Sequence, residues 1–285
     1  MAITLGTSSR APKSNSEKLT FAQKARELIV PVSEVSDYLT MCVYGRNGSG
    51  KTTFIGSSDL KTLIIDCNEK GTLSVRRRPN VFRFKLTSWE QTDWIYWFLR
   101  SKSNDYQVIG IDTITGLAVI CMKWILKEEA DRDFNRDPLM PDKRHWGKLG
   151  IMIKEFITRF TNLEAHVIFT AQEKTSATDD EEEGGTTIET HPELSPSPRS
   201  TLLGAVDIIG RIYTREVEVE GKKKIERRML VGPHPRYVAK DRTGALGLVQ
   251  RRPTLASFIE KGLPAITPGE TDAPAAEKSP SLDLS

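Results

Sequence analysis

The sequence has few cysteines, no long apolar run and no secretory signal, and each of these absences excludes a class of protein. Only 3 of its 285 residues are cysteines, and they lack C-x-x-C spacing, so neither a disulfide framework nor a zinc site is expected. The longest apolar run, residues 116–122, is far shorter than the roughly 20 residues of a membrane span. The first ten residues lack the basic-then-apolar plan of a signal peptide. We therefore expect a cytoplasmic protein that does not associate with membranes.

Short β-rich runs alternate with longer helical patterns between residues 38 and 172. Four runs are almost continuously apolar, as strands buried on both faces of a parallel sheet are. They cover residues 39–44, 62–66, 107–112 and 166–171. Helical patterns lie between them, at 51–57, 88–101, 115–131 and 145–162. This alternation predicts an α/β fold in which helices flank a mainly parallel sheet.

Composition sets the expected limits of the folded domain. Residues 1–15 are mostly small or polar and are expected to form a flexible leader, and one amphipathic helix is expected before Pro31. Residues 264–285 are rich in Pro, Ala, Glu and Ser and are expected to form a disordered tail. The domain is therefore expected to cover residues 16–263.

Two segments after residue 172 differ sharply in charge. Residues 173–200 hold eight acidic and two basic residues with three prolines, which predicts a mobile acidic loop. Two strand-like runs within 208–232 predict a β-hairpin with a basic tip. From Arg211 to Arg252 there are 12 Lys or Arg against 5 Asp or Glu, a surplus of +7. The positive charge of the chain is thus localised near its C-terminal end.

Residues 45–52 satisfy the pattern G-x-x-x-x-G-K-[ST] of a P-loop, directly after an apolar strand and before a helix. Its glycines let backbone N–H groups surround a phosphate, and the following helix adds its positive N-terminal dipole. Lys51 is expected to reach the β- and γ-phosphates, and Thr52 to offer a hydroxyl to Mg²⁺. ATP and Mg²⁺ are the predicted cofactors, and the predicted nucleotide-binding residues are Gly45, Arg46, Asn47, Gly48, Ser49, Gly50, Lys51, Thr52 and Thr53.

A carboxylate at the end of a neighbouring strand is needed to hold the magnesium ion. Asp112 ends the apolar run Val-Ile-Gly-Ile-Asp and is predicted to do so together with Thr52. Thr113 follows it, so a water-activating glutamate is absent at that point. If the protein hydrolyses ATP, the catalytic carboxylate must lie elsewhere.

Further motifs accompany the P-loop. They are Asp66 with Glu69, Ile111-Asp112-Thr113, Trp146-Gly147, Thr170-Ala-Gln172 and Lys240-Asp-Arg242-Thr-Gly244. With these motifs the sequence resembles RecA-fold ATPases, most closely the compact phage-encoded RecA-core ATPases associated with single-strand annealing recombination. The resemblance spans about residues 38–260 and implies an Mg²⁺-dependent ATPase acting in DNA recombination in a bacterial host cell. It also implies a homo-oligomeric ring or filament, with single-stranded DNA and a single-strand DNA-binding protein as partners.

The resemblance implies catalytic roles for four further residues. Glu69 would orient the attacking water, although Asp66-Cys-Asn-Glu69 is one residue longer than the family's Asp-x-Glu. Gln172 would hydrogen-bond the γ-phosphate and pass its presence to the segment that follows. Lys240 and Arg242 would enter a neighbouring subunit's nucleotide site, where a guanidinium stabilises charge on the transferred phosphoryl group.

The segment after Gln172 occupies the place of the DNA-binding loop of RecA proteins, but the acidic run 179–183 would repel phosphates. DNA contact is therefore expected at a basic site elsewhere. One candidate is Arg76–Arg78. The other is the hairpin, with Lys222, Lys223, Lys224, Arg227 and Arg228.

Other functions of a P-loop stay open at this point. The main alternative is a regulatory switch that binds nucleotide and a protein partner without DNA. A small-molecule kinase is disfavoured by the lack of an Arg-rich lid, and a GTPase by the lack of an N-K-x-D motif. DNA-stimulated ATP hydrolysis would distinguish the recombination ATPase from these alternatives.

Overall fold

The computed structural model describes residues 21–29, 31, 38–67, 70–101, 103–133, 137, 139–180, 185–219 and 221–263. The chain separates into two units, Met1–Ser36 and Asp37–Ser285. In the first unit the described residues form helix α1 (Phe21–Leu28), inside the predicted N-terminal helix. The predicted leader 1–15 and the predicted tail 264–285 lie outside the described residues.

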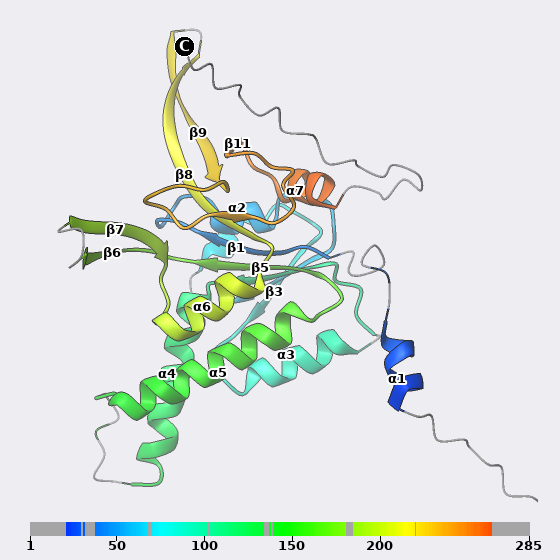
Figure 1. Cartoon of the computed structure of the whole chain (residues 1–285), viewed down its shortest axis with the longest axis vertical. Helices are drawn as coiled ribbons and strands as arrows, with labels where there is room; N and C mark the ends of the chain where they lie inside the picture. The colour runs from blue at the N-terminus through cyan, green and yellow to red at the C-terminus, as the bar shows by residue number, and fades with distance from the viewer. Residues whose placement is uncertain are drawn as a thin grey trace, which may run out of the picture. The chain divides into compact units, whose positions relative to one another are not determined.

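The second unit is built on one large sheet (Figure 1). Its strands are β1 (Thr40–Tyr44), β2 (Thr62–Asp66), β3 (Val81–Lys85), β4 (Val108–Asp112), β5 (His166–Ala171), β8 (Ile208–Val219), β9 (Lys222–Leu230), β10 (Lys240–Asp241) and β11 (Val249–Arg251). Among the described residues these nine strands take the order β11-β9-β8-β1-β5-β4-β2-β3, with β10 paired to β8. Strands β3, β2, β4, β5, β1 and β8 run parallel. Strands β9, β10 and β11 are antiparallel to their partners. The predicted mainly parallel sheet and C-terminal hairpin are confirmed.

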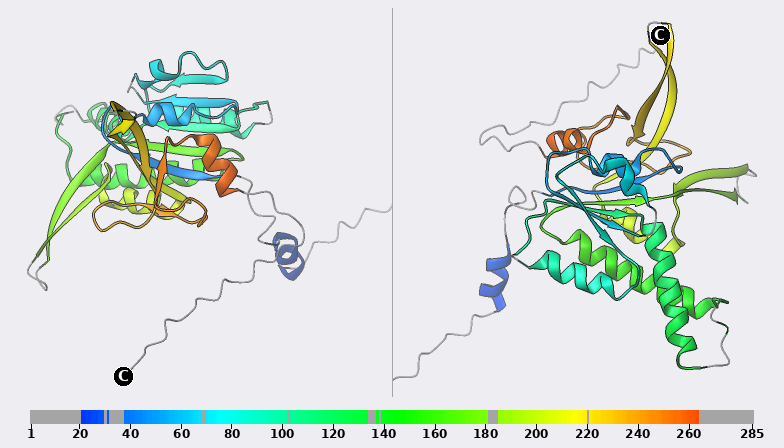
Figure 2. Two further views of the ribbon diagram at one scale, coloured as in Figure 1. Left: turned by 90° about the horizontal axis from the view of Figure 1, so that it is seen from above. Right: turned by 180° about the vertical axis from the view of Figure 1, so that it is seen from behind.

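Helices cover both faces of this sheet, as Figures 1 and 2 show. One face packs on α3 (Gln91–Arg100), α4 (Ile114–Ala130), α5 (Lys143–Thr161) and α6 (Pro196–Ala205). The other packs on α2 (Lys51–Ile55), the 3-10 helix η2 (Gly71–Val75) and α7 (Leu255–Gly262). Strand β1 is almost entirely apolar because both of its faces are buried. Cys42 and Tyr44 pack on the α3–α6 side of the sheet, and Met41 and Val43 on the α2–α7 side.

The prediction of a loop over 173–200 is wrong for the described part of that segment. Strands β6 (Glu173–Asp180) and β7 (Gly185–Pro192) form an antiparallel two-stranded ribbon. Both strands consist mostly of polar residues, including the paired Thr175 and Thr190, so they show no apolar alternation for sequence reasoning to detect. Of the three prolines that suggested a loop, Pro192 ends β7, and Pro196 and Pro198 lie in the first turn of helix α6, where a missing N–H costs nothing. Residues 181–184 are outside the described residues.

The parallel strands bring the P-loop, Asp112 and Gln172 to one edge of the sheet. Tyr44 lies opposite Ala171, and Asp66 opposite Asp112, so β1, β5, β4 and β2 end together. Because β5 lies between β1 and β4, the residue after β5 is placed between the loop after β1 and the carboxylate that ends β4. This edge is where α/β proteins bind ligands.

Candidate nucleotide-binding site

The loop from Gly45 to Gly50 connects β1 to α2 and has the shape of a phosphate cradle. Gly50 has a left-handed φ of 101°, which a glycine adopts without strain. Ser49 is buried, and its Oγ has no hydrogen-bond partner among the described residues. A Cβ placed on Gly45 would lie 3.0 Å from that hydroxyl and 2.3 Å from the carbonyl oxygen of Ile212. A tight glycine loop with an unused buried hydroxyl fits a bound phosphate.

Lys51 holds its ammonium group inside this loop. Its side chain is 7% exposed, and Nζ donates hydrogen bonds to the carbonyl oxygens of Gly45 at 2.9 Å and Arg46 at 3.1 Å. A third bond of 3.0 Å reaches Oε1 of Gln172. The two predicted catalytic residues Lys51 and Gln172 are therefore brought into direct contact, from positions 121 apart in the sequence.

Thr52 and Asp112, the two predicted metal ligands, also meet. The Thr52 hydroxyl donates to Asp112 Oδ2 at 2.6 Å, and the Thr170 hydroxyl donates to Asp112 Oδ1 at 2.6 Å. Asp112 is 2% exposed. A hydroxyl and a carboxylate are the hard oxygen ligands that Mg²⁺ prefers. Next to them, a Cβ on Gly71 would lie 2.5 Å from Thr52 Oγ1, so the missing side chain keeps space open beside the pair. These residues fit a magnesium ion.

Gln172 connects the P-loop to the β6–β7 ribbon. Its backbone N–H donates to Thr115 Oγ1 at 3.1 Å, and that hydroxyl donates to the carbonyl oxygen of Glu193 at 3.0 Å. The Glu193 N–H donates back to the Gln172 carbonyl at 2.8 Å. A shift of Gln172 would therefore move Glu193, the residue directly after β7. The role of Gln172 as a sensor stays a prediction.

Glu173 is a residue of the site that sequence reasoning missed. Its carboxylate pairs with Arg46 of the P-loop at 2.9 Å and with Arg211 of β8 at 3.0 Å, and its side chain is only 11% exposed. The signal available in the sequence was its position directly after Gln172. Two cavities, of about 350 and 410 Å³, are both lined by Arg46, Asn47 and Glu173.

Glu69, the predicted water-orienting carboxylate, lies outside the described residues, so its position is not given by the structure. Its neighbour Asp66 ends β2, is 1% exposed and forms an ion pair of 2.5 Å with Arg83 of β3. Asp66 is thus engaged at the sheet edge. The role of Glu69 stays a prediction.

The structure does not bring Lys240 and Arg242 to the P-loop of their own chain. Strand β10 pairs with Ile208 and Ile209 at the start of β8. The start of β8 lies toward the edge of the parallel sheet opposite the P-loop. Lys240 Nζ donates to the Leu203 carbonyl at 2.5 Å, and Arg242 Nη2 to the Gly204 carbonyl at 2.6 Å. Burial and the nearby guanidinium of Arg242 lower the pKa of Lys240. Both cations close the last turn of α6 in this chain.

The five basic residues of the β8–β9 hairpin do not form one surface. Lys222, Lys223 and Lys224 are exposed and begin β9, directly after the turn. Lys223 pairs with Glu216 across the hairpin at 2.7 Å. Arg228 pairs with Glu226 at 2.6 Å, with both side chains largely buried, and Arg227 Nε donates to the Ser49 carbonyl of the P-loop at 3.1 Å. DNA contact by these residues stays a prediction. The three lysines are the most exposed of the five, and Lys223 would have to exchange its surface ion pair with Glu216 for a phosphate.

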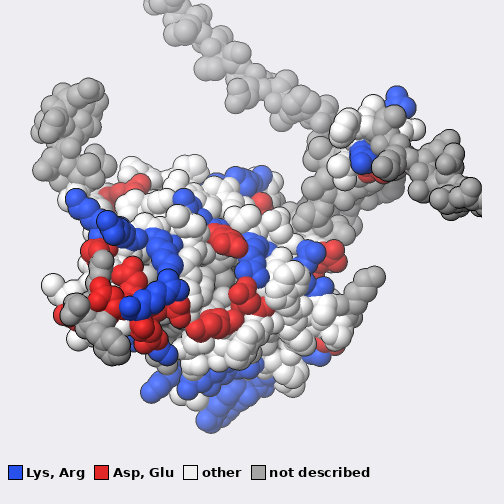
Figure 3. Space-filling model, turned by 90° about the horizontal axis from the view of Figure 1, so that it is seen from below, with Lys and Arg blue, Asp and Glu red and all other residues white. Residues whose placement is uncertain are grey.

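Arg76–Arg78, the alternative basic site, follows η2 and is exposed. Figure 3 shows that Lys and Arg side chains gather in several groups on the face seen from below, with acidic side chains between them. Positive charge is therefore dispersed over that face rather than concentrated in one broad patch.

Cysteines and histidines have structural environments in this fold. All three cysteines are free and buried, and burial raises the pKa of the Cys42 and Cys121 thiols to about 12, so neither is a nucleophile. His145 completes the capping box of α5 with Asp142. Within the described residues, no group of three or more His, Cys, Asp or Glu side chains could hold a metal ion.

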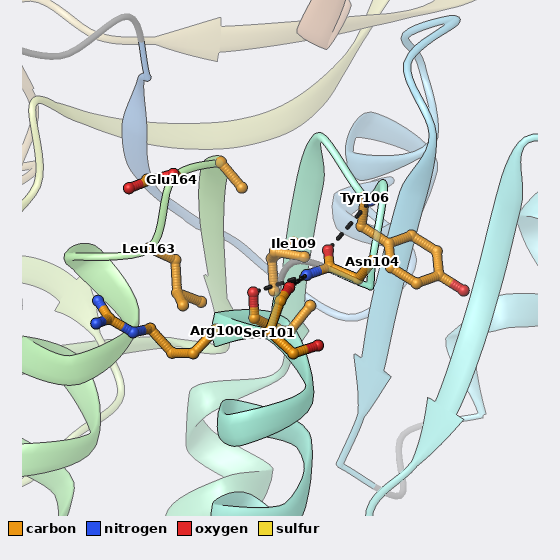
Figure 4. A pocket seen from close by; sticks show the side chains of 9 residues that line it. Arg100, Ser101, Asn104, Tyr106, Ile109, Leu163 and Glu164 are labelled. Atoms are coloured by element: carbon orange, nitrogen blue, oxygen red, sulfur yellow. Dashed lines mark hydrogen bonds between the residues drawn. The ribbon is translucent and has the colours of Figure 1, made fainter.

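A separate cavity of about 360 Å³ lies at the opposite edge of the sheet, where α3 ends and β4 begins (Figure 4). The Asn104 side chain donates to the carbonyl oxygens of Leu99 and Ser101 at 2.8 Å and accepts from the Tyr106 N–H at 3.3 Å. These bonds hold the turn between α3 and β4. The cavity is remote from the P-loop and does not belong to the nucleotide site.

Together, the glycine loop, the buried lysine and the Thr52–Asp112 pair define a P-loop nucleotide-binding site on an α/β fold. A family model described as an AAA domain matches residues 37–243. The chain therefore belongs to this family of P-loop ATPases. No curated protein matches the chain. None of the described helices is long and apolar enough to span a membrane.

Proposed function

We propose that the protein is an Mg²⁺-dependent ATPase of RecA type that acts on single-stranded DNA in recombination or strand annealing. The observation that carries this proposal is the contact between Lys51 and Gln172 beside the Thr52–Asp112 pair. This contact places the phosphate-binding loop and the metal ligands beside Gln172, whose backbone is hydrogen-bonded to Thr115 and Glu193 near the β6–β7 ribbon. That combination suits a protein in which the state of the nucleotide controls another surface.

The residues of this chain would divide the chemistry as follows. The P-loop amides and Lys51 would bind the phosphates, and Thr52 and Asp112 would hold Mg²⁺, which supplies charge neutralisation when bound. Lys51 would exchange its bond to Gln172 Oε1 for a phosphate oxygen, and Gln172 would donate a hydrogen bond from Nε2 to the γ-phosphate. Glu69 is the proposed water-orienting carboxylate.

We further propose that the protein works as a ring or filament in the cytoplasm of a bacterial host cell. Lys240 and Arg242 lie far from the P-loop of their own chain, which supports a role at the nucleotide site of a neighbouring subunit. Single-stranded DNA would bind the exposed lysines of the hairpin, and a single-strand DNA-binding protein would act as a further partner.

A nucleotide switch that binds a protein partner is the second candidate function. A cavity of about 750 Å³ between α4, the start of α5 and the base of the β6–β7 ribbon favours it. Its walls include the exposed apolar side chains of Val119, Leu139 and Trp146. Exposed apolar surface of this kind often marks a protein-binding site.

The deciding experiment measures ATP turnover with and without single-stranded DNA of mixed sequence, with duplex DNA as a control. The recombination ATPase requires turnover that rises with single strands. Lys51→Ala should lower turnover by roughly two to three orders of magnitude, the effect of removing one preorganised electrostatic group, while its circular dichroism matches the parent. Nucleotide binding without any DNA effect would favour the switch, and turnover unaffected by Lys51→Ala would contradict the P-loop assignment.

A further inference from the structure

The strand β9 sends one arginine onto the P-loop of its own chain. Arg227 Nε donates to the Ser49 carbonyl at 3.1 Å. A Cβ built on Gly50 would lie 2.2 Å from Nε and 2.5 Å from Cζ of the same guanidinium. The group therefore packs directly against the Gly50 backbone, in space that any other residue at position 50 would fill.

The hairpin fixes this position of Arg227. Its backbone is paired with Thr214 of β8, and its carbonyl accepts a hydrogen bond of 2.8 Å from the Arg252 N–H. Because side chains alternate along a strand, Glu226 and Arg228 lie on the other face, where they form their own ion pair of 2.6 Å. Arg227 is thus held from both sides and separated from the nearest carboxylate of its strand.

The charge of Arg227 has no acidic partner within the part of the chain that the structure describes, although the residue is half-buried. A partly buried charge is costly unless an opposite charge compensates it. A guanidinium has five N–H donors and can form paired, charge-assisted hydrogen bonds with phosphate. The bond from Nε to Ser49 uses one of these five donors. The loop against which it lies is the one that collects phosphate.

We propose that Arg227 is a phosphate contact supplied in cis, which couples a bound nucleoside di- or triphosphate to the β8–β9 hairpin. This inference rests on the proposed nucleotide binding and adds a residue and a transmission route to it. Lys222–Lys224 lie on the same strand as Arg227, so ordering of β9 by the nucleotide reaches the hairpin tip through the backbone alone. Coupling of this kind is reciprocal: whatever binds the tip alters nucleotide affinity by the same factor.

The first test measures the affinity of the purified full chain for a fluorescent ADP analogue with Mg²⁺ present. Arg227→Ala should weaken binding about tenfold, the usual scale for one charge-assisted hydrogen bond, and Arg227→Lys should restore only part of it. Arg215→Ala is the matched control, because Arg215 is an exposed arginine of the same hairpin and its removal costs the same charge. It should bind like the parent.

The second test follows backbone hydrogen exchange in the unmodified protein, a measurement that needs no variant, and then repeats it in Arg227→Ala. ADP should slow exchange along β9, and the effect should be lost in Arg227→Ala. If Arg227→Ala binds within twofold of the parent, or if ADP leaves exchange in β9 unchanged, the inference is wrong while the P-loop assignment stands. If Lys51→Ala binds nucleotide as the parent does, the proposed function fails, whatever Arg227 shows.

Discussion

The hydroxyl of Thr52 donates a 2.6 Å hydrogen bond to Oδ2 of Asp112, although 60 positions separate the two residues in the sequence. Thr52 lies in α2, which follows β1, and Asp112 ends β4. Strand β5 lies between β1 and β4 in the sheet, and its Thr170 holds the other carboxylate oxygen. The carboxylate is thus fixed by hydroxyls from two elements before any metal arrives. Such preorganisation is what a rigid metal-binding pair requires.

Gly71→Ala should disturb this pair without harming the fold. The added Cβ would lie 2.5 Å from Thr52 Oγ1 and 3.1 Å from Asp112 Oδ2, so the Thr52 hydroxyl must shift. We expect ATP turnover to fall roughly ten- to a hundredfold, because small displacements of a reactive group have effects of this size. The Mg²⁺ concentration for half-maximal turnover should rise. A magnesium titration of the ATPase rate measures both.

Gly147→Ala is the control for this substitution. Gly147 lies in α5, and a Cβ there would meet nothing within 4 Å. It should keep parental turnover and raise the free energy of unfolding by about 0.5–1 kcal/mol, since alanine favours a helix over glycine. If Gly71→Ala matched this control at every magnesium concentration, the space beside Thr52 would have no role in metal binding.

The sequence was sufficient to predict the central fold because parallel strands that are buried on both faces have nearly continuous apolar sequences. Strands β1, β2, β4 and β5 follow that rule and appear where expected. Strand β3 was missed because it is an edge strand, only partly buried, and the β6–β7 ribbon because its strands are polar. A hydrophobic pattern identifies a strand only where the strand is buried, so strands that are exposed cannot be predicted in this way.

The site shows the same division. Lys51, Thr52 and Asp112 were predicted because a local motif or a strand end fixes their geometry. Gly71 and Arg227 were not predicted at the P-loop, since their contacts depend on how η2 and β9 pack against it. A charge run in a sequence gives no information about strand register, and register decides that Arg227 and Lys222–Lys224 have different neighbours.

Arg242 should complete the nucleotide site of a neighbouring subunit. It contacts the Gly204 carbonyl in its own chain and lies at the sheet edge opposite the P-loop. Lys51→Ala and Arg242→Ala should each be inactive alone, and mixing them in equal amounts should restore activity. About a quarter of the shared sites would then have both residues, if subunits meet head to tail at random. Turnover across mixing ratios measures this.

The control labels Lys51→Ala with a fluorescent donor and Arg242→Ala with an acceptor, and follows energy transfer after mixing. A rise in transfer establishes that subunits exchange on the timescale of the assay. Absence of recovery at every ratio, with exchange demonstrated, would argue against a site shared between subunits.

The hairpin tip should bind the backbone of single-stranded DNA without sequence preference. Lys222, Lys223 and Lys224 are exposed, while Arg228 pairs with Glu226 and Arg227 contacts the P-loop. A plot of log affinity against log salt should have a slope of roughly −3 for the parent, the value for about four phosphate contacts. Replacing the three lysines with alanine should flatten it by about 2 units, since each lost phosphate contact contributes about 0.7. Turnover without DNA should hardly change.

Alanine at Arg76, Arg77 and Arg78 serves as the comparison, because it removes the same charge from another exposed site. A slope that changes there and not in the lysine variant would move the DNA site to η2. A parent protein that binds no DNA would favour the nucleotide switch.

His166 should make the fold less stable in mild acid. Its Nδ1 accepts a hydrogen bond of 3.0 Å from the Leu39 N–H, and the side chain is 7% exposed. Burial lowers the pKa of His166 below its ordinary value near 6.5. The unfolded chain therefore binds this proton at a higher pH than the folded chain does. Stability is complete above the unfolded pKa and falls as the pH drops toward the folded pKa, by at most about 1.4 kcal/mol per pH unit.

His166→Asn isolates this contribution. The asparagine Oδ1 can replace Nδ1 as acceptor for the Leu39 N–H, and the side chain does not titrate in this range. Urea unfolding of both proteins should be measured between pH 7.5 and 5. As the pH falls, the free energy of unfolding should decrease more for the parent than for the variant, because protonated Nδ1 can no longer accept that bond. Parallel pH dependence in the two proteins would mean that His166 stays neutral or is solvated in both states.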